Sequence, residues 1–231
     1  MFMQTLIGIG AVLLGYILGS IPFGLLIVKI KTGKDIREIE SGRTGGTNAM
    51  RAAGFWAGLL TAIMDIMKGA VSVWIAEALL PDGDVIHLLA PVASIIGHNY
   101  SIFLLSRDED GKVRFHGGAG GAPALGGAAG FWGWSLPIVF ALGASVFFTL
   151  GIASVTTMSV ALFVTIIFAI RASMGLMPWT DVLYGVIAGG LLLWALRPNL
   201  RKLLSGNERV VKYSLNGWLR ARKEAKAEAN K

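Results

Sequence analysis

Hydrophobic residues dominate this chain in runs that are long enough to cross a lipid bilayer. The longest apolar stretch is interrupted by Pro137, by the polar run 154–159 and by the segment 171–181. With those interruptions taken as boundaries, apolar runs lie at 5–30, 53–80, 85–105, 119–134, 136–151, 154–170 and 181–196. The pattern predicts an all-α integral membrane protein with about seven transmembrane helices.

Basic residues are distributed unevenly around these runs. Of 21 Lys and Arg residues, all but Lys68 and Arg171 fall within 29–51, within 107–114 or after position 196. Seven spans place the three clusters on one face, which the positive-inside rule makes cytoplasmic. We therefore expect one multi-pass domain over residues 1–231 in the cell (inner) membrane. Its N-terminus is outside, and a basic cytoplasmic tail begins at about residue 205.

Composition excludes several chemistries. The 231 residues include no cysteine, and the three histidines are scattered, so neither a metal site nor a cofactor is expected. We find no nucleotide-binding fingerprint and no Ser-His-Asp arrangement. The net charge of +7 permits nucleic-acid binding, but Glu224 and Glu228 interrupt the basic tail and argue against it. Residues 218–231 are interpreted as a solvated helix or as an interfacial helix on anionic membrane lipid.

A glycine- and hydroxyl-rich loop follows the first apolar run. Its glycines allow backbone N–H groups to turn inward, its hydroxyl side chains add donors, and its arginines add forked cations. This combination is typical of a phosphate held at the start of a helix. The loop consists of Ser41, Gly42, Arg43, Thr44, Gly45, Gly46, Thr47 and Asn48, with Arg51 three residues further on.

Other candidate residues permit two interpretations each. Asp65 and Lys68 share a helical face, and are either a self-neutralising packing pair or the border of an anionic substrate site. His98 is a packing residue or a catalyst. Gly117 and Gly118 open a second glycine-rich segment, which either allows close helix packing or binds an anion. Polar residues near the ends of later spans, Ser154, Asn199 and Glu208, carry little weight alone.

Taken together and in order, these fragments resemble the bacterial acyl-phosphate:glycerol-3-phosphate acyltransferases over nearly the whole chain. The fragments that carry the resemblance are Gly19-Ser20-Ile21-Pro22-Phe23-Gly24, Asp35-Ile36-Arg37, the loop from Ser41 to Arg51, Asp65…Lys68-Gly69, Gly97-His98-Asn99-Tyr100 and Gly206…Glu208. The resemblance implies acyl transfer from acyl phosphate to the 1-hydroxyl of glycerol 3-phosphate. The products are lysophosphatidic acid and phosphate.

The resemblance also implies roles for individual residues. The first loop, Ser41 to Asn48, would cradle the donor phosphate. Arg51, Ser154 and Asn199 would hold glycerol 3-phosphate, and Asn199 matches an active-site asparagine. No covalent acyl-enzyme is expected, since the donor's own phosphate is a plausible base for the attacking hydroxyl. Catalysis would rest on proximity and on charge stabilisation.

The chain departs from the family pattern at functional positions. Arg43 stands where asparagine is usual, and a motif with two lysines reads His116-Gly117-Gly118-Ala119-Gly120. A histidine expected three positions before Asn199 reads Leu196. Arg43, Lys112, Arg114 or Arg197 would have to supply the missing charge. Three interpretations stay open: an active, divergent acyltransferase, a paralogue with lost activity or a changed acceptor, and a small lipid-phosphate or anion transporter.

Overall fold

The first apolar run folds as two consecutive helices because Pro22 interrupts it. In the computed structural model, which describes residues 1–229, α1 (Phe2–Ser20) ends at Ile21, whose backbone is extended with φ −60° and ψ 117°. α2 (Phe23–Thr32) begins directly after Pro22. Proline has no N–H group and disfavours helical geometry at the residue before it. The predicted run at 5–30 therefore contains a helix break near its centre.

One further helix falls in each of the other predicted runs. They are α4 (Phe55–Leu79), α5 (Asp84–Asn99), α6 (Gly121–Phe131), α7 (Ser135–Leu150), α8 (Ala153–Ser173) and α9 (Trp179–Ala195). In the described residues, four segments are long and apolar enough to cross a membrane, and α9 with α10 (Arg197–Leu204), bent by 69°, would make a fifth. The helical membrane architecture agrees with the prediction. The count of seven spans and the orientation of the termini stay predictions.

α6 is the helix that departs most from a spanning segment. Its 11 residues rise about 16 Å, about half of the roughly 30 Å hydrocarbon core. Most of its side chains are buried, and it packs tightly on α4. A Cβ at Gly126 would collide with the carbonyl oxygen of Ile66. Close approach through small residues is typical of helix packing in membranes, so α6 is held inside the bundle.

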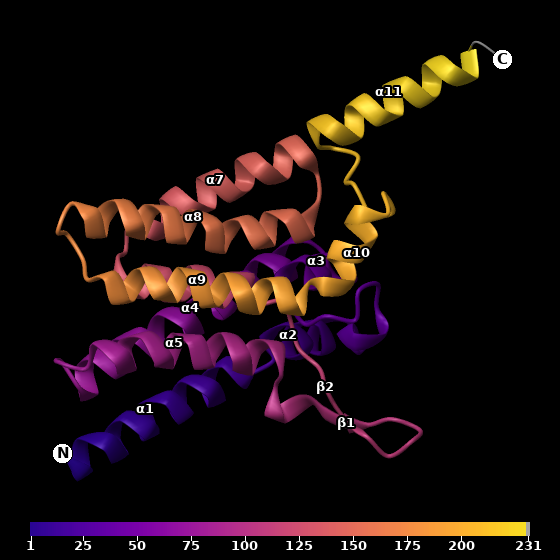
Figure 1. The fold of residues 1–231 in the computed structure, drawn as a ribbon. Coiled ribbons are helices and arrows are strands. Elements are labelled where there is room, and N and C mark those ends of the chain that lie inside the picture. The colour runs from indigo at the N-terminus through magenta and orange to yellow at the C-terminus, as the bar shows by residue number, and fades with distance from the viewer. Residues whose placement is uncertain (230–231) are drawn as a thin grey trace.

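The shorter elements gather at the end of the bundle opposite the N-terminus (Figure 1). They are η1 (Ile36–Glu38), α3 (Gly46–Ala53), η2 (Ile102–Leu104), β1 (Leu105–Arg107), β2 (Val113–Phe115) and α10. The antiparallel hairpin β1–β2 pairs Leu105 with Phe115, which corrects the all-α expectation for this loop. α11 (Leu215–Ala229) extends away from the bundle (Figure 1). Residues 230 and 231 of the predicted tail lie outside the described residues.

Candidate functional site

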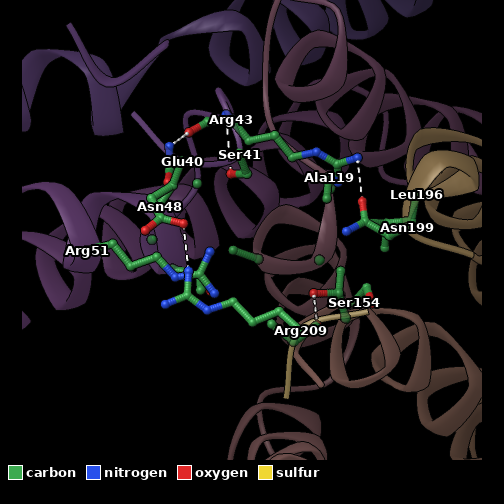
Figure 2. A pocket seen from close by; sticks show the side chains of 18 of the residues that line it. Glu40, Ser41, Arg43, Asn48, Arg51, Ala119, Ser154, Leu196, Asn199 and Arg209 are labelled. Atoms are coloured by element: carbon green, nitrogen blue, oxygen red, sulfur yellow. Dashed lines mark hydrogen bonds and ion pairs between the residues drawn. The ribbon is translucent and has the colours of Figure 1, made fainter. Parts of the chain in front are cut away.

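A cavity of about 400 Å³ lies at this end of the bundle, between the first loop and the C-terminal segment. Its wall combines Gly45, Gly46 and Thr47 at the start of α3 with Gly120, Gly121 and Ala122 at the start of α6. Ala153, Ser154 and Thr157 at the start of α8 complete it, together with residues of α10 and of the segment that follows α10. Segments that are far apart in the sequence therefore converge on one open pocket (Figure 2).

Asn48 holds the first loop in its shape. Its side-chain amide shares two N–H donors among the carbonyl oxygens of Ile36, Ile39 and Arg43, at 3.2, 3.0 and 2.9 Å. The amide is buried, so these bonds are shielded from water. The N–H group of Thr44 also donates to Gly117, at 3.2 Å. Asn48 therefore shapes the cavity wall, and Thr44 joins the two glycine-rich segments.

The loop leaves backbone donors free at the cavity. Within the described residues, the N–H groups of Gly45, Gly46 and Thr47 have no hydrogen-bond acceptor, although all three residues line the cavity. The first N–H groups of a helix have no partner inside the helix and carry the positive end of its dipole. Because α6 and α8 also begin at the cavity wall, three helix N-termini favour a negative charge there.

Arg43 adds a guanidinium group to this wall. One of its terminal nitrogens donates to the carbonyl oxygen of Ala195 at 2.8 Å and to Asn199 Oδ1 at 3.0 Å. Figure 2 shows the side chain reaching from the first loop to Asn199. Burial lowers the pKa of Arg43, and the charge of Glu208 opposes that decrease. The ordinary pKa of arginine is so high that the group keeps its charge at neutral pH. No carboxylate of the described residues pairs with it.

Glu208 joins the C-terminal segment to the site. Its Oε1 accepts hydrogen bonds from Ser154 Oγ at 2.7 Å and from Asn199 Nδ2 at 2.9 Å. The same Asn199 accepts from Arg43 through its other amide atom. These contacts arrange Ser154, Asn199 and Arg43 as one hydrogen-bonded chain along the cavity wall. Ser154, Asn199 and Arg43, which are far apart in the sequence, are therefore coupled through the Glu208 carboxylate and the Asn199 side-chain amide.

Asp65, Lys68 and His98 form a buried polar cluster beside the cavity, which Asp65 and His98 line. The Lys68 ammonium lies 2.8 Å from Asp65 Oδ1, 2.9 Å from His98 Nδ1 and 3.2 Å from the carbonyl oxygen of Ile21. An ammonium group only donates, so Nδ1 of His98 accepts and the ring proton sits on Nε2. The contacts with Ile21 and His98 are hydrogen bonds and the contact with Asp65 is an ion pair, and Lys68 does not line the cavity. Its position therefore favours the packing interpretation over the border of a substrate site.

The structure brings most of the predicted site residues to the cavity. Those that line it are Ser41, Arg43, Gly45, Gly46, Thr47, Asn48, Arg51, Asp65, His98, Ser154, Asn199 and Glu208. Gly42, Lys68, Gly117 and Gly118 do not line it. Gly118 instead packs so closely on His98 that a Cβ would collide with the imidazole ring. The position of Gly117 and Gly118 therefore favours a role in close packing over anion binding.

Of the cations that the sequence offered for the missing charge, Arg43 lines the cavity, and two further lining cations, Lys202 and Arg209, were missed. Arg114 pairs with Asp108 in the hairpin at 2.9 Å, and Arg197 stacks on Trp194 at 4.2 Å. These two residues and Lys112 do not line the cavity, whereas Lys202 and Arg209 do. A local signal existed for both, because Lys202 follows Asn199 by three residues on a helix and Arg209 follows Glu208. Glu40, Asn207 and Ala122 were also missed as lining residues, whereas Ala119, Gly120 and Gly121 belong to the second glycine-rich segment and line the cavity.

The residues present show no metal centre. In the described part of the chain, no group of three or more His, Cys, Asp or Glu residues is arranged to hold a metal ion. The cavity instead combines backbone N–H groups with four cationic side chains: Arg43, Arg51, Lys202 and Arg209. Both kinds of group are hydrogen-bond donors that favour anions.

Fold and cavity together define a helical membrane protein with a cation-lined pocket at one end of its bundle. The chain belongs to the glycerol-3-phosphate acyltransferase family, whose family model matches residues 9–206. A glycerol-3-phosphate acyltransferase of Rubrobacter xylanophilus is 36% identical over 201 residues, covering 86% of this chain and 92% of that protein. Glycerol-3-phosphate acyltransferase 2 of Moorella thermoacetica is 34% identical over 207 residues, covering 86% and 94%.

Solved structures show the same relationship. The crystal structure of PlsY, an integral membrane glycerol 3-phosphate acyltransferase, in its glycerol 3-phosphate form superposes with a TM-score of 0.75 at 28% identity. The alignment covers 88% of this chain and 95% of that one. The lysophosphatidic acid form superposes with a TM-score of 0.74 at 27% identity, covering 89% and 96%.

Proposed function

We propose that this chain is a membrane acyltransferase that moves a fatty acyl group from acyl phosphate to the 1-hydroxyl of glycerol 3-phosphate. The products are lysophosphatidic acid and inorganic phosphate. The observation that carries the proposal is the convergence of three helix N-termini and four cationic side chains on one cavity. Each substrate brings a phosphate group with a charge of about −1.5 to −2, which such a cavity suits. Family membership supports the acceptor.

The donor phosphate is assigned to the first loop. The free N–H groups of Gly45, Gly46 and Thr47 supply a backbone cradle, and Ser41 and Arg43 add side-chain donors. Asn48 acts indirectly by fixing the loop. With its phosphate here, the acyl phosphate would extend its chain between helices and keep its carbonyl group at the membrane surface.

The acceptor is assigned to the rest of the cavity wall, from Arg51 on α3 to Ser154 and Asn199 across the pocket (Figure 2). Arg51 supplies a cation for the phosphate of glycerol 3-phosphate, while Ser154 and Asn199 supply polar groups held by Glu208. Holding both reactants in one cavity makes the step effectively unimolecular. Helix dipoles and arginine charges then stabilise the negative charge that develops on the carbonyl oxygen and on the departing phosphate.

In the proposed step, the acceptor's 1-hydroxyl oxygen forms a bond to the acyl carbon and the acyl–phosphate C–O bond breaks. The hydroxyl proton moves to the departing phosphate, so atoms and charge balance without a protein nucleophile. Ser154 lines the cavity and donates its hydroxyl group to the Glu208 carboxylate at 2.7 Å, so replacing it tests whether a protein nucleophile takes part. Ser154→Ala should raise the KM of glycerol 3-phosphate without abolishing turnover, and intact-protein mass spectrometry with palmitoyl phosphate alone should find no acyl adduct. A stoichiometric adduct would contradict the direct step.

The decisive assay uses the purified full chain, palmitoyl phosphate and labelled glycerol 3-phosphate. We expect labelled lysophosphatidic acid and release of inorganic phosphate in equal amounts. Absence of product, with an active family member assayed in parallel, would instead favour a paralogue with lost activity or a changed acceptor. A transporter is not favoured, because the cavity lies at one end of the bundle, whereas transporter sites typically lie near the bilayer midplane.

The location of the site has its own test. The proposal puts the cavity on the cytoplasmic face of the cell membrane, with the N-terminus outside, on the strength of the basic residues that surround it. A protease-cleavable tag fused to the C-terminus should be cut in inverted vesicles and protected in intact cells. The opposite pattern would overturn this orientation and would leave the acyl-transfer assay unaffected.

A further inference from the structure

Arg209 lies on the C-terminal segment that closes one side of the cavity, beyond residues 9–206 that the family model matches. The backbone of this segment is fixed against the turn between α7 and α8. Val211 donates its N–H group to the carbonyl oxygen of Gly151 at 2.8 Å, and the side chain of Asn216 donates to Leu150 at 3.0 Å. The neighbouring Glu208 is held by two hydrogen bonds. Arg209 therefore has a fixed backbone.

The side chain of Arg209, in contrast, is mostly exposed. Its guanidinium spans the cavity mouth and contacts Glu40 Oε2 at 2.6 Å, joining residues 169 positions apart (Figure 2). The side chains are 60% and 43% exposed, and ion pairs exposed to this extent contribute little to stability because water competes for both charges. The pair is therefore easily exchanged for another anion.

The backbone at Glu40 supports the same conclusion. Among the described residues, Glu40 is the one non-glycine residue with a positive φ, at 49°. This left-handed conformation is unfavourable for a residue with a Cβ. A weak surface ion pair does not compensate an unfavourable backbone, so stability alone gives no reason for this arrangement. Residues held in such conformations cluster at binding and switch regions.

The charges around the cavity suggest what replaces Glu40. Of the four lining cations, Arg209 alone has a carboxylate partner within the described residues, while Arg43, Arg51 and Lys202 have none. A phosphate monoester carries more charge than a carboxylate and accepts two parallel hydrogen bonds from a guanidinium. An entering phosphate therefore competes directly with Glu40 for Arg209.

We propose that Arg209 is a phosphate-binding residue of the acyl-transfer site and that Glu40 holds it as a latch while the site is empty. A substrate phosphate at the cavity mouth displaces the Glu40 carboxylate and takes the Arg209 guanidinium. This inference rests on the proposed function for the identity of the phosphate, which is that of glycerol 3-phosphate or of the acyl phosphate. Under this proposal, substitutions of Arg209 and of Glu40 change substrate binding in opposite directions.

Arg209→Gln removes the guanidinium group that binds the phosphate. Glu40→Gln removes the carboxylate charge that competes with the phosphate, and keeps the shape of the side chain. We expect Arg209→Gln to raise the KM of one substrate about tenfold, within the range for loss of a charged hydrogen bond. Glu40→Gln should lower the same KM about threefold, and Arg209→Lys should recover part of the loss. Because the contact acts in binding, kcat should change less than KM. The substrate whose KM moves identifies the phosphate.

The hairpin supplies a matched control pair. Arg114 is 65% exposed and contacts Asp108 at 2.9 Å, but neither residue lines the cavity. Arg114→Gln and Asp108→Asn should leave both KM values unchanged. If Arg209→Gln and Glu40→Gln change KM in the same direction, or change neither KM, the latch is overturned and the pair is only a structural contact.

A binding measurement separates failure of the latch from failure of the proposed function. Calorimetric titration of the full chain with glycerol 3-phosphate, and separately with inorganic phosphate, reports Kd without turnover. Opposite shifts of Kd in Arg209→Gln and Glu40→Gln support the latch even if no variant, wild type included, transfers an acyl group. Equal or absent shifts of Kd overturn the latch even if the wild type is fully active.

Discussion

The Arg43 guanidinium donates a 3.0 Å hydrogen bond to the side-chain oxygen of Asn199, although 156 positions separate the two residues. This contact ties the first loop to the start of α10. It also sets the direction of a half-buried cation that has no carboxylate partner within the described residues. The cavity therefore contains a positioned guanidinium near the free N–H groups of α3.

Replacing Arg43 tests whether that cation binds substrate. We expect Arg43→Asn to lower kcat/KM by about 10- to 150-fold, the equivalent of about 1.5–3 kcal/mol for a charged hydrogen bond. Ala119 lines the same cavity, so the double variant Arg43→Asn, Ala119→Lys returns a positive charge and should recover at least about tenfold. Arg197→Asn, outside the cavity, is the control. Full activity of Arg43→Asn would contradict the role of this cation.

Alanine substitutions at two glycines distinguish an effect on ligand binding from an effect on folding stability. A Cβ at Gly45 meets no atom within 4 Å, whereas one at Gly24 would collide with the carbonyl oxygen of Thr44. Gly45→Ala should keep the Tm of the purified protein and raise the KM of acyl phosphate, since the methyl group occupies the approach to the N–H groups. Gly24→Ala should destabilise the protein by about 1–3 kcal/mol. An unchanged KM of acyl phosphate in Gly45→Ala would contradict the assignment of the donor phosphate to this loop.

Glu208 offers a test of geometry against charge. Both of its hydrogen bonds reach Oε1, and glutamine keeps a carbonyl oxygen that can accept them. We expect Glu208→Gln to retain kcat/KM within about fivefold, and Glu208→Ala to lose about 10- to 100-fold because two donors lose their partner. Equal loss in both variants would instead assign the effect to the negative charge near Arg43.

The buried pair of Lys68 and Asp65 is predicted to act in stability. Lys68→Met leaves the Asp65 carboxylate buried without its ammonium partner, which should cost about 3–5 kcal/mol. The double variant Lys68→Met, Asp65→Leu removes both charges and should be more stable than Lys68→Met alone. Thermal unfolding in detergent measures both. If Lys68→Met has an unchanged Tm but no activity, the interpretation of Lys68 as the border of the substrate site would be favoured instead.

The sequence by itself determined the helical membrane architecture, because long apolar runs admit few other folds in lipid. It also identified the loop from Ser41 to Asn48 as a candidate site, because glycine, hydroxyl and cationic residues at the start of a helix indicate anion binding and are close together in the sequence. The order of short motifs indicated the family, to which the chain belongs. These features depend on composition and spacing, which are readable along the chain.

Only the tertiary structure decided which cations share the cavity. Arg114 and Lys202 look equally available in the sequence, yet Arg114 pairs within a hairpin and Lys202 lines the cavity. Bonds such as Arg43 to Asn199 and Arg209 to Glu40 join positions more than 150 residues apart. Such pairings depend on how helices pack and on where each side chain points. Neither property follows from local sequence, because packing is set by contacts that form only when the whole bundle assembles.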